Sequence, residues 1–184
     1  MITINELIEM TLNALEKLYE NDEILFINDV NERTLVFRLG IYLDNILNKN
    51  DKFKYLNVDS EYNRNIRGID IYKSIGIENY RRKTYPDLII HERGTNDNNQ
   101  LVIEFKKCVR NKRNDYLILE SKQINIDDAK LKYYTAKNKE YKFKLGLAII
   151  FGKVLEDTII TVYLNGKVYN EYGYNYLKQI YHTI

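Results

Sequence analysis

Residues 85–107, YPDLIIHERGTNDNNQLVIEFKK, decide the fold that we predict for this chain of 184 residues. Two apolar runs, 86–91 and 101–106, are separated by a cluster of glycine, asparagine and aspartate at 94–99. Such clusters form turns, so the stretch predicts two antiparallel strands joined by a short polar loop. Both strands are apolar on both faces, which predicts a central place in a sheet that is covered on both sides.

The alternation of side chains along a strand gathers the polar residues of this hairpin. Glu104 and Lys106 share one face of the second strand. If Asp87 pairs opposite either of them, all three polar side chains lie on the same side of the sheet, whereas a slip of one residue separates them. Buried carboxylates are costly unless they are paired or bound to metal. Two carboxylates and a nearby lysine therefore suit a hard divalent cation beside an amine that stabilises charge.

A structural interpretation of the same residues needs no ligand. Asp87 would be a surface residue at the start of a strand, and Glu104 would form an ion pair with Lys106 or with another lysine, because charged strand residues usually face water. The apolar residues on both sides of Glu104, and the Pro-Asp start of the first strand, argue against this interpretation.

The ordered set of acidic and basic residues resembles the PD-(D/E)XK nuclease superfamily, whose members share the restriction-endonuclease-like fold. The similarity is to small, mostly uncharacterised members and covers about residues 31–152. It is carried by Glu32-Arg33, Glu61-Tyr62-Asn63-Arg64, Pro86 to His91, and Glu104-Phe105-Lys106-Lys107.

The resemblance implies a metal-dependent nuclease that hydrolyses phosphodiester bonds in DNA or, as the alternative substrate, RNA. Asp87 and Glu104 would bind Mg²⁺ or Mn²⁺, with the backbone carbonyl of Phe105 as a further ligand. Lys106 would orient the attacking water or stabilise the charge that develops on the phosphate. The rival hypothesis is a non-catalytic module that keeps the nuclease fold and binds nucleic acid or protein. The intact motif argues against it.

Two further acids can each be interpreted in two ways. Glu32 is the third residue of a helix predicted from Asp29, where it would complete a capping box. Its helical spacing from the apolar residues that follow also places its carboxylate on the face toward the sheet. Glu61 ends a strand predicted at 55–62 and faces either solvent or the site. The resemblance implies that both acids act with the metal site, either as ligands or by orienting its ligands.

Local clusters of lysine and arginine are the candidate phosphate contacts, because the net charge of +2 is nearly balanced. Most of them lie in an irregular stretch at 63–84 and directly after the second motif strand. The candidates are Arg64, Arg81, Arg82, Lys83, Lys107, Arg110, Lys112, Arg113 and Lys130. Solvated loops are the alternative interpretation of these stretches.

Composition narrows the class of protein. A single cysteine, Cys108, excludes an internal disulfide and suits a reducing cytoplasm. The sequence has no run of about twenty apolar residues, so no membrane-spanning helix is expected. The first twenty residues carry four glutamates and lack the pattern of a signal peptide.

Periodicity predicts the remaining elements. They are helices at 3–20, 29–49, 127–139 and 174–181, a buried strand at 143–151, and a second hairpin at 158–169 that turns at Asn165-Gly166. This order predicts an α/β fold with a mixed central sheet flanked by helices, in agreement with the αβββαβ core of the restriction-endonuclease-like fold. One domain, 1–184, would contain the core and a C-terminal extension from 153. Tyrosines in that extension make it a candidate homodimer surface.

Overall fold

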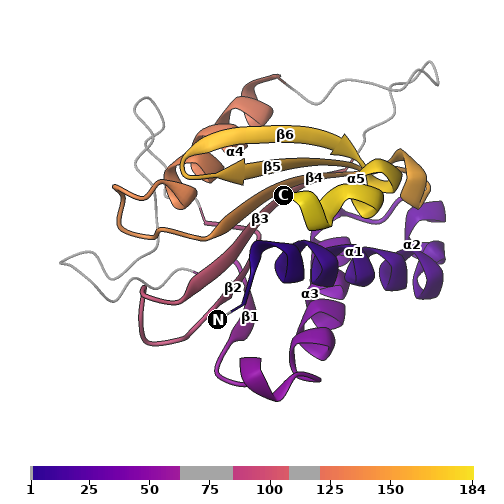
Figure 1. Ribbon diagram of the computed structural model, residues 1–184. Coiled ribbons are helices and arrows are strands. Elements are labelled where there is room, and N and C mark those ends of the chain that lie inside the picture. Colours follow the sequence, from indigo (N-terminus) through magenta and orange to yellow (C-terminus); the bar gives the residue numbers. More distant parts are fainter. Residues whose placement is uncertain (1, 63–84, 108–120) are drawn as a thin grey trace.

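The computed structural model describes residues 2–62, 85–107 and 121–184, which form one six-stranded sheet with helices on both faces (Figure 1). The strands are β1 (Asn57–Ser60), β2 (Leu88–His91), β3 (Asn99–Lys107), β4 (Leu145–Phe151), β5 (Ile159–Leu164) and β6 (Lys167–Gly173). Their order in the sheet follows the chain. β3 and β4 are parallel and all other neighbours are antiparallel, so the predicted α/β class with a mixed sheet is confirmed.

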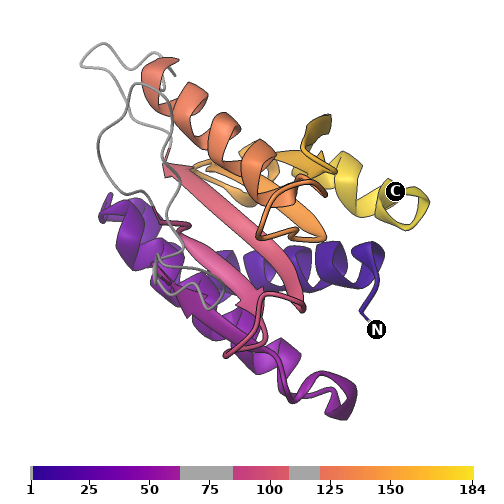
Figure 2. The ribbon, with the colours of Figure 1, turned by 90° about the vertical axis from the view of Figure 1, so that its left-hand side faces the viewer.

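Helices cover the two faces of the sheet unequally. The helices are α1 (Ile4–Asn21), α2 (Glu23–Ile27), α3 (Glu32–Leu47), α4 (Ser121–Thr135) and α5 (Tyr174–Ile180), with short 3₁₀ turns at Asp51–Phe53, Leu155–Asp157 and Tyr181–Thr183. The larger core joins α1, α3 and α5 to one face of the sheet. On the other face, Leu131 and Tyr134 of α4 pack against Ile89 and Val102 (Figure 2).

The hairpin of β2 and β3 forms as predicted. Leu88 pairs with Ile103 and Ile89 with Val102, and both strands are buried on both faces. Continuing this antiparallel register by one residue brings Asp87 opposite Glu104. The side chains of Asp87 and Glu104 therefore share the face that α4 covers.

The second predicted hairpin is also confirmed, and its turn follows from two residues. Asn165 and Gly166 have φ values of 54° and 82°, as the central residues of a two-residue hairpin turn require. The second strand, β6, is longer than predicted. It forms an edge of the sheet, and most of its side chains are exposed.

The predicted start of α3 is wrong. Asp29 has a φ of 53°, which is outside the right-handed helical region, so it cannot open the helix. The N-cap is Asn31, whose side chain accepts a hydrogen bond of 2.9 Å from the Thr34 N–H. Glu32 is thus the first helical residue, and it does not complete a capping box with Asp29.

The predicted bounds of α4 are wrong at both ends, because the helix runs from Ser121 to Thr135. Asp127 and Asp128 lie within the helix rather than capping it. Lysines one turn later neutralise both, since Lys130 pairs with Asp127 and Lys132 pairs with Asp128.

Candidate active site

Asp87, just before β2, is fixed by backbone contacts on both sides. Its Oδ2 accepts a hydrogen bond of 2.8 Å from the Phe105 N–H of β3. Its carbonyl accepts from the Ser60 hydroxyl at 2.9 Å and from the Glu61 N–H at 3.3 Å. The end of β1 and the middle of β3 thus hold Asp87 between them.

Glu104 is the most deeply buried acid of the site, with 2% of its side chain exposed. Its Oε2 lies 2.5 Å from Nζ of Lys130, whose side chain is 7% exposed. The other carboxylate oxygen, Oε1, has no hydrogen-bond partner among the described residues. The predicted ion pair of Glu104 therefore exists, but the lysine comes from α4 and not from β3.

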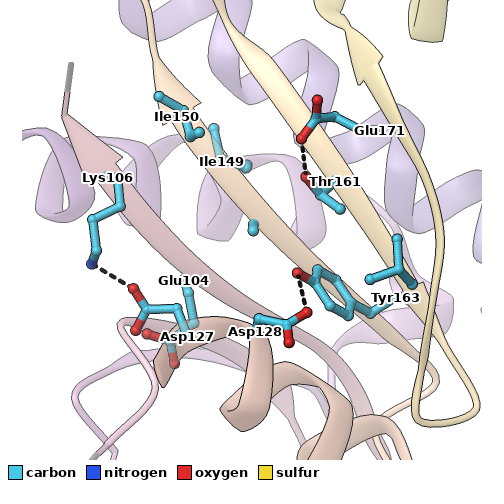
Figure 3. A pocket seen from close by; sticks show the side chains of 11 residues that line it. Glu104, Lys106, Asp127, Asp128, Ile149, Ile150, Thr161, Tyr163 and Glu171 are labelled. Atoms are coloured by element: carbon cyan, nitrogen blue, oxygen red, sulfur yellow. Dashed lines mark hydrogen bonds and ion pairs between the residues drawn. The ribbon is translucent and has the colours of Figure 1, made fainter. Parts of the chain in front are cut away.

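Lys106 points from β3 toward α4, where it meets an acid that the sequence interpretation missed (Figure 3). Its Nζ lies 2.8 Å from Asp127 Oδ2 and donates to the Phe105 carbonyl at 2.9 Å. Asp127 also lies 3.5 Å from the Lys130 ammonium group. A hint was present in the sequence, because Asp127 precedes Lys130 by one helical turn.

Glu32 reaches the end of β3 from the first turn of α3. Its Oε2 accepts a hydrogen bond of 3.0 Å from the Lys107 N–H. The Lys107 side chain turns away from Glu32 to the carbonyl of Val30 and the carboxylate of Asp29, both at 2.5 Å. Glu32 therefore lies with the motif residues and fastens α3 to β3.

Glu104, Asp87 and Glu32 have raised pKa values, and burial is the main cause for each. Burial raises the pKa of Glu104 well above its usual range, and the neighbouring Asp87 raises it further despite Lys130. Burial also raises the pKa of Asp87, against the hydrogen bond from Phe105, and that of Glu32, against Lys106. Burial lowers the pKa of Lys106, but the hydrogen bond with Asp127 and the nearby acids reverse this, so the pKa is raised.

Glu61 does not join this cluster. Its side chain is 57% exposed and lies 3.5 Å from the guanidinium group of Arg33 on α3. Its φ of 47° turns the chain at the end of β1. The structure therefore favours the interpretation in which Glu61 faces solvent and not the site.

The structure describes only two of the predicted phosphate contacts. Lys130 was expected on a basic surface, but it is buried against Glu104, because an uncompensated carboxylate there would be costly. Lys107 is held by Val30 and Asp29. The other candidates, and the stretch 63–84, lie outside the described residues; they are Arg64, Arg81, Arg82, Lys83, Arg110, Lys112 and Arg113.

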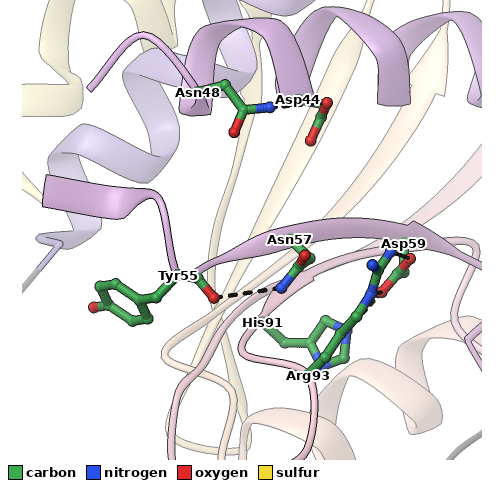
Figure 4. Close-up of polar contacts among 7 residues, drawn as sticks. All are labelled: Asp44, Asn48, Tyr55, Asn57, Asp59, His91 and Arg93. Carbon is green, nitrogen blue, oxygen red and sulfur yellow. Dashed lines mark hydrogen bonds and ion pairs between the residues drawn. The ribbon is translucent and has the colours of Figure 1, made fainter. Parts of the chain in front are cut away.

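A second polar cluster joins β1 to β2 (Figure 4). Asp59 accepts from both the Nε and Nη2 groups of Arg93 and lies 2.9 Å from Nε2 of the buried His91. Burial raises the pKa of Asp59, but the hydrogen bonds from Arg93 and His91 outweigh it and hold the pKa well below its usual range. The ring of Tyr62 meets His91 edge-on at 4.4 Å. These contacts fasten the edge strand next to Asp87.

The motif acids fit a divalent ion in ligand type and in charge. All candidate ligands are oxygen atoms, which Mg²⁺ prefers. Four carboxylates, Glu32, Asp87, Glu104 and Asp127, meet two ammonium groups, which leaves a formal excess of two negative charges. In the present arrangement, however, no three acid, histidine or cysteine side chains of the described residues are grouped to hold an ion. The ammonium group of Lys130 lies at Glu104, where a cation would bind.

Comparison of the chain with protein-family models, curated proteins and solved structures gave no match. Within the described ranges, none of the helices has the length and apolar character needed to span a membrane.

Proposed function

We propose that this protein is a metal-dependent nuclease of the PD-(D/E)XK type that hydrolyses phosphodiester bonds, with DNA as the first substrate to test and RNA as the second. The observation that carries the proposal is the register of β2 and β3, which sets Asp87 opposite Glu104. Lys106 shares this face of β3 with Glu104, so all three motif residues lie on one face of the hairpin, which supports the proposal.

Asp87, Glu104 and the Phe105 carbonyl would hold Mg²⁺ or Mn²⁺. When bound, the ion would polarise the scissile phosphate and lower the pKa of a bound water. Lys106 supplies a positive charge beside the phosphate, and Asp127 holds its ammonium group in place at 2.8 Å. Glu32 positions the end of β3 through the Lys107 N–H. Lys130 keeps Glu104 neutralised while no ion is bound.

One observation favours the rival function, a non-catalytic binding module with the same fold. Two lysines already neutralise Glu104 and Asp127, so these residues can form a purely structural network. This alternative does not explain two features, which are the excess of two negative charges and the unpaired Glu104 Oε1. We therefore prefer the nuclease.

The proposal has consequences for location and assembly. A protein with a single cysteine suits the cytoplasm, where DNA and Mg²⁺ are both available. Cutting both strands of a duplex needs two active sites or two visits. We propose a homodimer formed through the exposed edge strand β6, where Tyr169 is 51% exposed.

Cleavage assays test the function. Single-stranded, double-stranded and branched DNA and single-stranded RNA are incubated with the protein in Mg²⁺, in Mn²⁺ or in EDTA. We expect metal-dependent products from at least one substrate, and no products from Asp87→Asn or Lys106→Ala. Asp51→Asn, which alters an acid that is 87% exposed in the 3₁₀ turn after α3, is the matched control. Equal cleavage by all variants would remove the assigned site, and no cleavage by the wild type would favour the binding module.

A further inference from the structure

A cavity of about 480 Å³ adjoins the candidate active site (Figure 3). It lies between α4 and the strands β4, β5 and β6, with Glu104 and Lys106 at one end and Val168 and Glu171 among the residues that line it from β6. Its volume is within the range of pockets that hold small ligands, about 300–1,000 Å³. A group bound in this cavity would be close to whatever reacts at Glu104 and Lys106.

The sheet gives the cavity an apolar floor. Ala148 and Ile150 of β4, Tyr163 of β5 and Val168 of β6 contribute side chains to its lining. Apolar and aromatic side chains of this kind bind the faces of planar rings, as they do for unstacked nucleobases.

The polar part of the lining is acidic. Asp127, Asp128 and Glu171 line the cavity with Glu104, and among the described residues Lys106 is the one basic side chain in the lining. Asp128 already accepts from the Tyr163 hydroxyl at 3.2 Å and pairs with Lys132. Glu171 accepts from the Thr161 hydroxyl at 3.2 Å. Carboxylates repel phosphate and accept hydrogen bonds, so the lining selects an uncharged ring with N–H groups.

The Glu104 side chain is a further indication that the cavity binds a ligand. It is 2% exposed, and its Oε1 has no hydrogen-bond partner among the described residues. Buried polar atoms in folded proteins are nearly always paired, so an unpaired carboxylate oxygen on a residue that lines the cavity indicates a ligand at that end of it.

We propose that the cavity receives one unstacked base of the nucleic acid that is cut at the neighbouring site, with guanine preferred. This inference rests on the proposed nuclease function. Guanine presents two adjacent donors, N1–H and N2–H, which a single carboxylate such as Glu171 can accept together. Adenine and cytosine place an acceptor beside their amino group, and thymine places its one N–H between two carbonyls. A base within a duplex cannot enter, so the substrate is single-stranded or locally opened.

Nucleoside binding in EDTA tests the inference separately from catalysis. Guanosine, inosine and thymidine are titrated to millimolar concentrations against the whole protein, and binding is followed by NMR chemical shifts. Inosine lacks only the N2 amino group of guanosine. We expect guanosine to bind about tenfold more tightly than inosine, as the loss of one bond of a bidentate pair predicts, and thymidine to bind most weakly.

Two variants locate the binding site. Val168→Phe fills the cavity from an edge strand where Val168 is 44% exposed, so the larger side chain needs no rearrangement of the core. It should abolish guanosine binding. Glu171→Gln removes a charge but keeps an acceptor for the Thr161 hydroxyl, and it should remove the preference for guanosine over inosine. Glu156→Gln, an exposed acid in the 3₁₀ turn that contacts α1 and α5, is the matched control and should bind as the wild type does.

The outcomes separate the two proposals. Nucleic-acid cleavage without guanosine binding would overturn the base pocket and leave the nuclease standing. Guanosine binding without cleavage would keep the pocket and remove the nuclease. Equal binding of guanosine and thymidine, or binding of N-acetylarginine amide in place of guanosine, would also overturn the inference, the latter because it would make the cavity a site for cationic protein side chains.

Discussion

Replacement of Lys130 by methionine should destabilise the protein in a way that depends on pH. Lys130 and Glu104 are 7% and 2% exposed, so solvent screens their attraction little. Removing one partner of a buried pair typically costs about 3–5 kcal/mol, because the other charge is left uncompensated. That cost is the free energy by which loss of Lys130 disfavours the ionised form of Glu104, so the loss raises the pKa of Glu104.

The dependence on pH follows from the direction of that shift. The pKa of Glu104 in the folded protein is raised above its unfolded value of 4.5, and loss of Lys130 raises it further, since Lys130 lowers it. A raised folded pKa stabilises the protein below the unfolded pKa, and this stabilisation is lost as pH rises toward the folded pKa. The free energy of unfolding of the variant should therefore approach that of the wild type below pH 4.5. It should become lower than that of the wild type as pH rises toward neutrality.

Urea unfolding at about pH 4 and pH 7.5 measures this difference. Lys132→Met, which removes a 44% exposed lysine from a surface pair two residues further along α4, is the matched control and should cost less than about 1 kcal/mol at both pH values. If Mn²⁺ binds Glu104 once no lysine neutralises it, the ion should raise the free energy of unfolding of the Lys130→Met variant by about 2.7 kcal/mol at a concentration of 100 Kd. A deficit that is equal at both pH values, or equal to that of the control, would refute the assignment of Lys130 as the counter-ion of Glu104.

Three further predictions concern the motif residues and assembly. Asp87→Asn keeps an acceptor for the Phe105 N–H, so the free energy of unfolding should change by less than about 1 kcal/mol. Metal-dependent cleavage should fall more than about 100-fold. A large loss of stability measured by urea unfolding would favour a purely structural role. Glu32→Gln keeps an acceptor for the Lys107 N–H, so the melting temperature should hold while cleavage falls; unchanged cleavage would leave Glu32 as a support of β3. Light scattering at micromolar concentration should give the mass of a dimer, with or without DNA. A monomer mass in both conditions would remove the proposed β6 interface and point to nicking or single-strand cleavage.

Sequence reasoning succeeded where the structure is local. The apolar runs 86–91 and 101–106 predicted both strands. The shared face of Asp87 and Glu104 was predicted only if Asp87 pairs opposite Glu104 or Lys106, and the register of β2 and β3 meets that condition. Asn165-Gly166 identified the second hairpin, because few other pairs adopt positive φ at both positions.

It failed where a residue depends on a distant partner. Lys130 looks like a solvated helix lysine, and only its contact with Glu104, 26 residues earlier in the chain, makes it a core residue. Asp127 begins the predicted helix at 127–139, and nothing in the local sequence shows that its partner, Lys106, lies on another element. The start of α3 was displaced because both Asp29 and Asn31 are good caps, and the backbone at Asp29 excludes the first.

The most direct test of the central claim is the anomalous scattering of a crystal soaked in Mn²⁺. The account predicts a peak bound by Asp87, Glu104 and the Phe105 carbonyl, with the Lys130 ammonium group displaced from Glu104. No peak at these residues, with Lys130 still beside Glu104, would contradict it and leave the buried charges as a structural network.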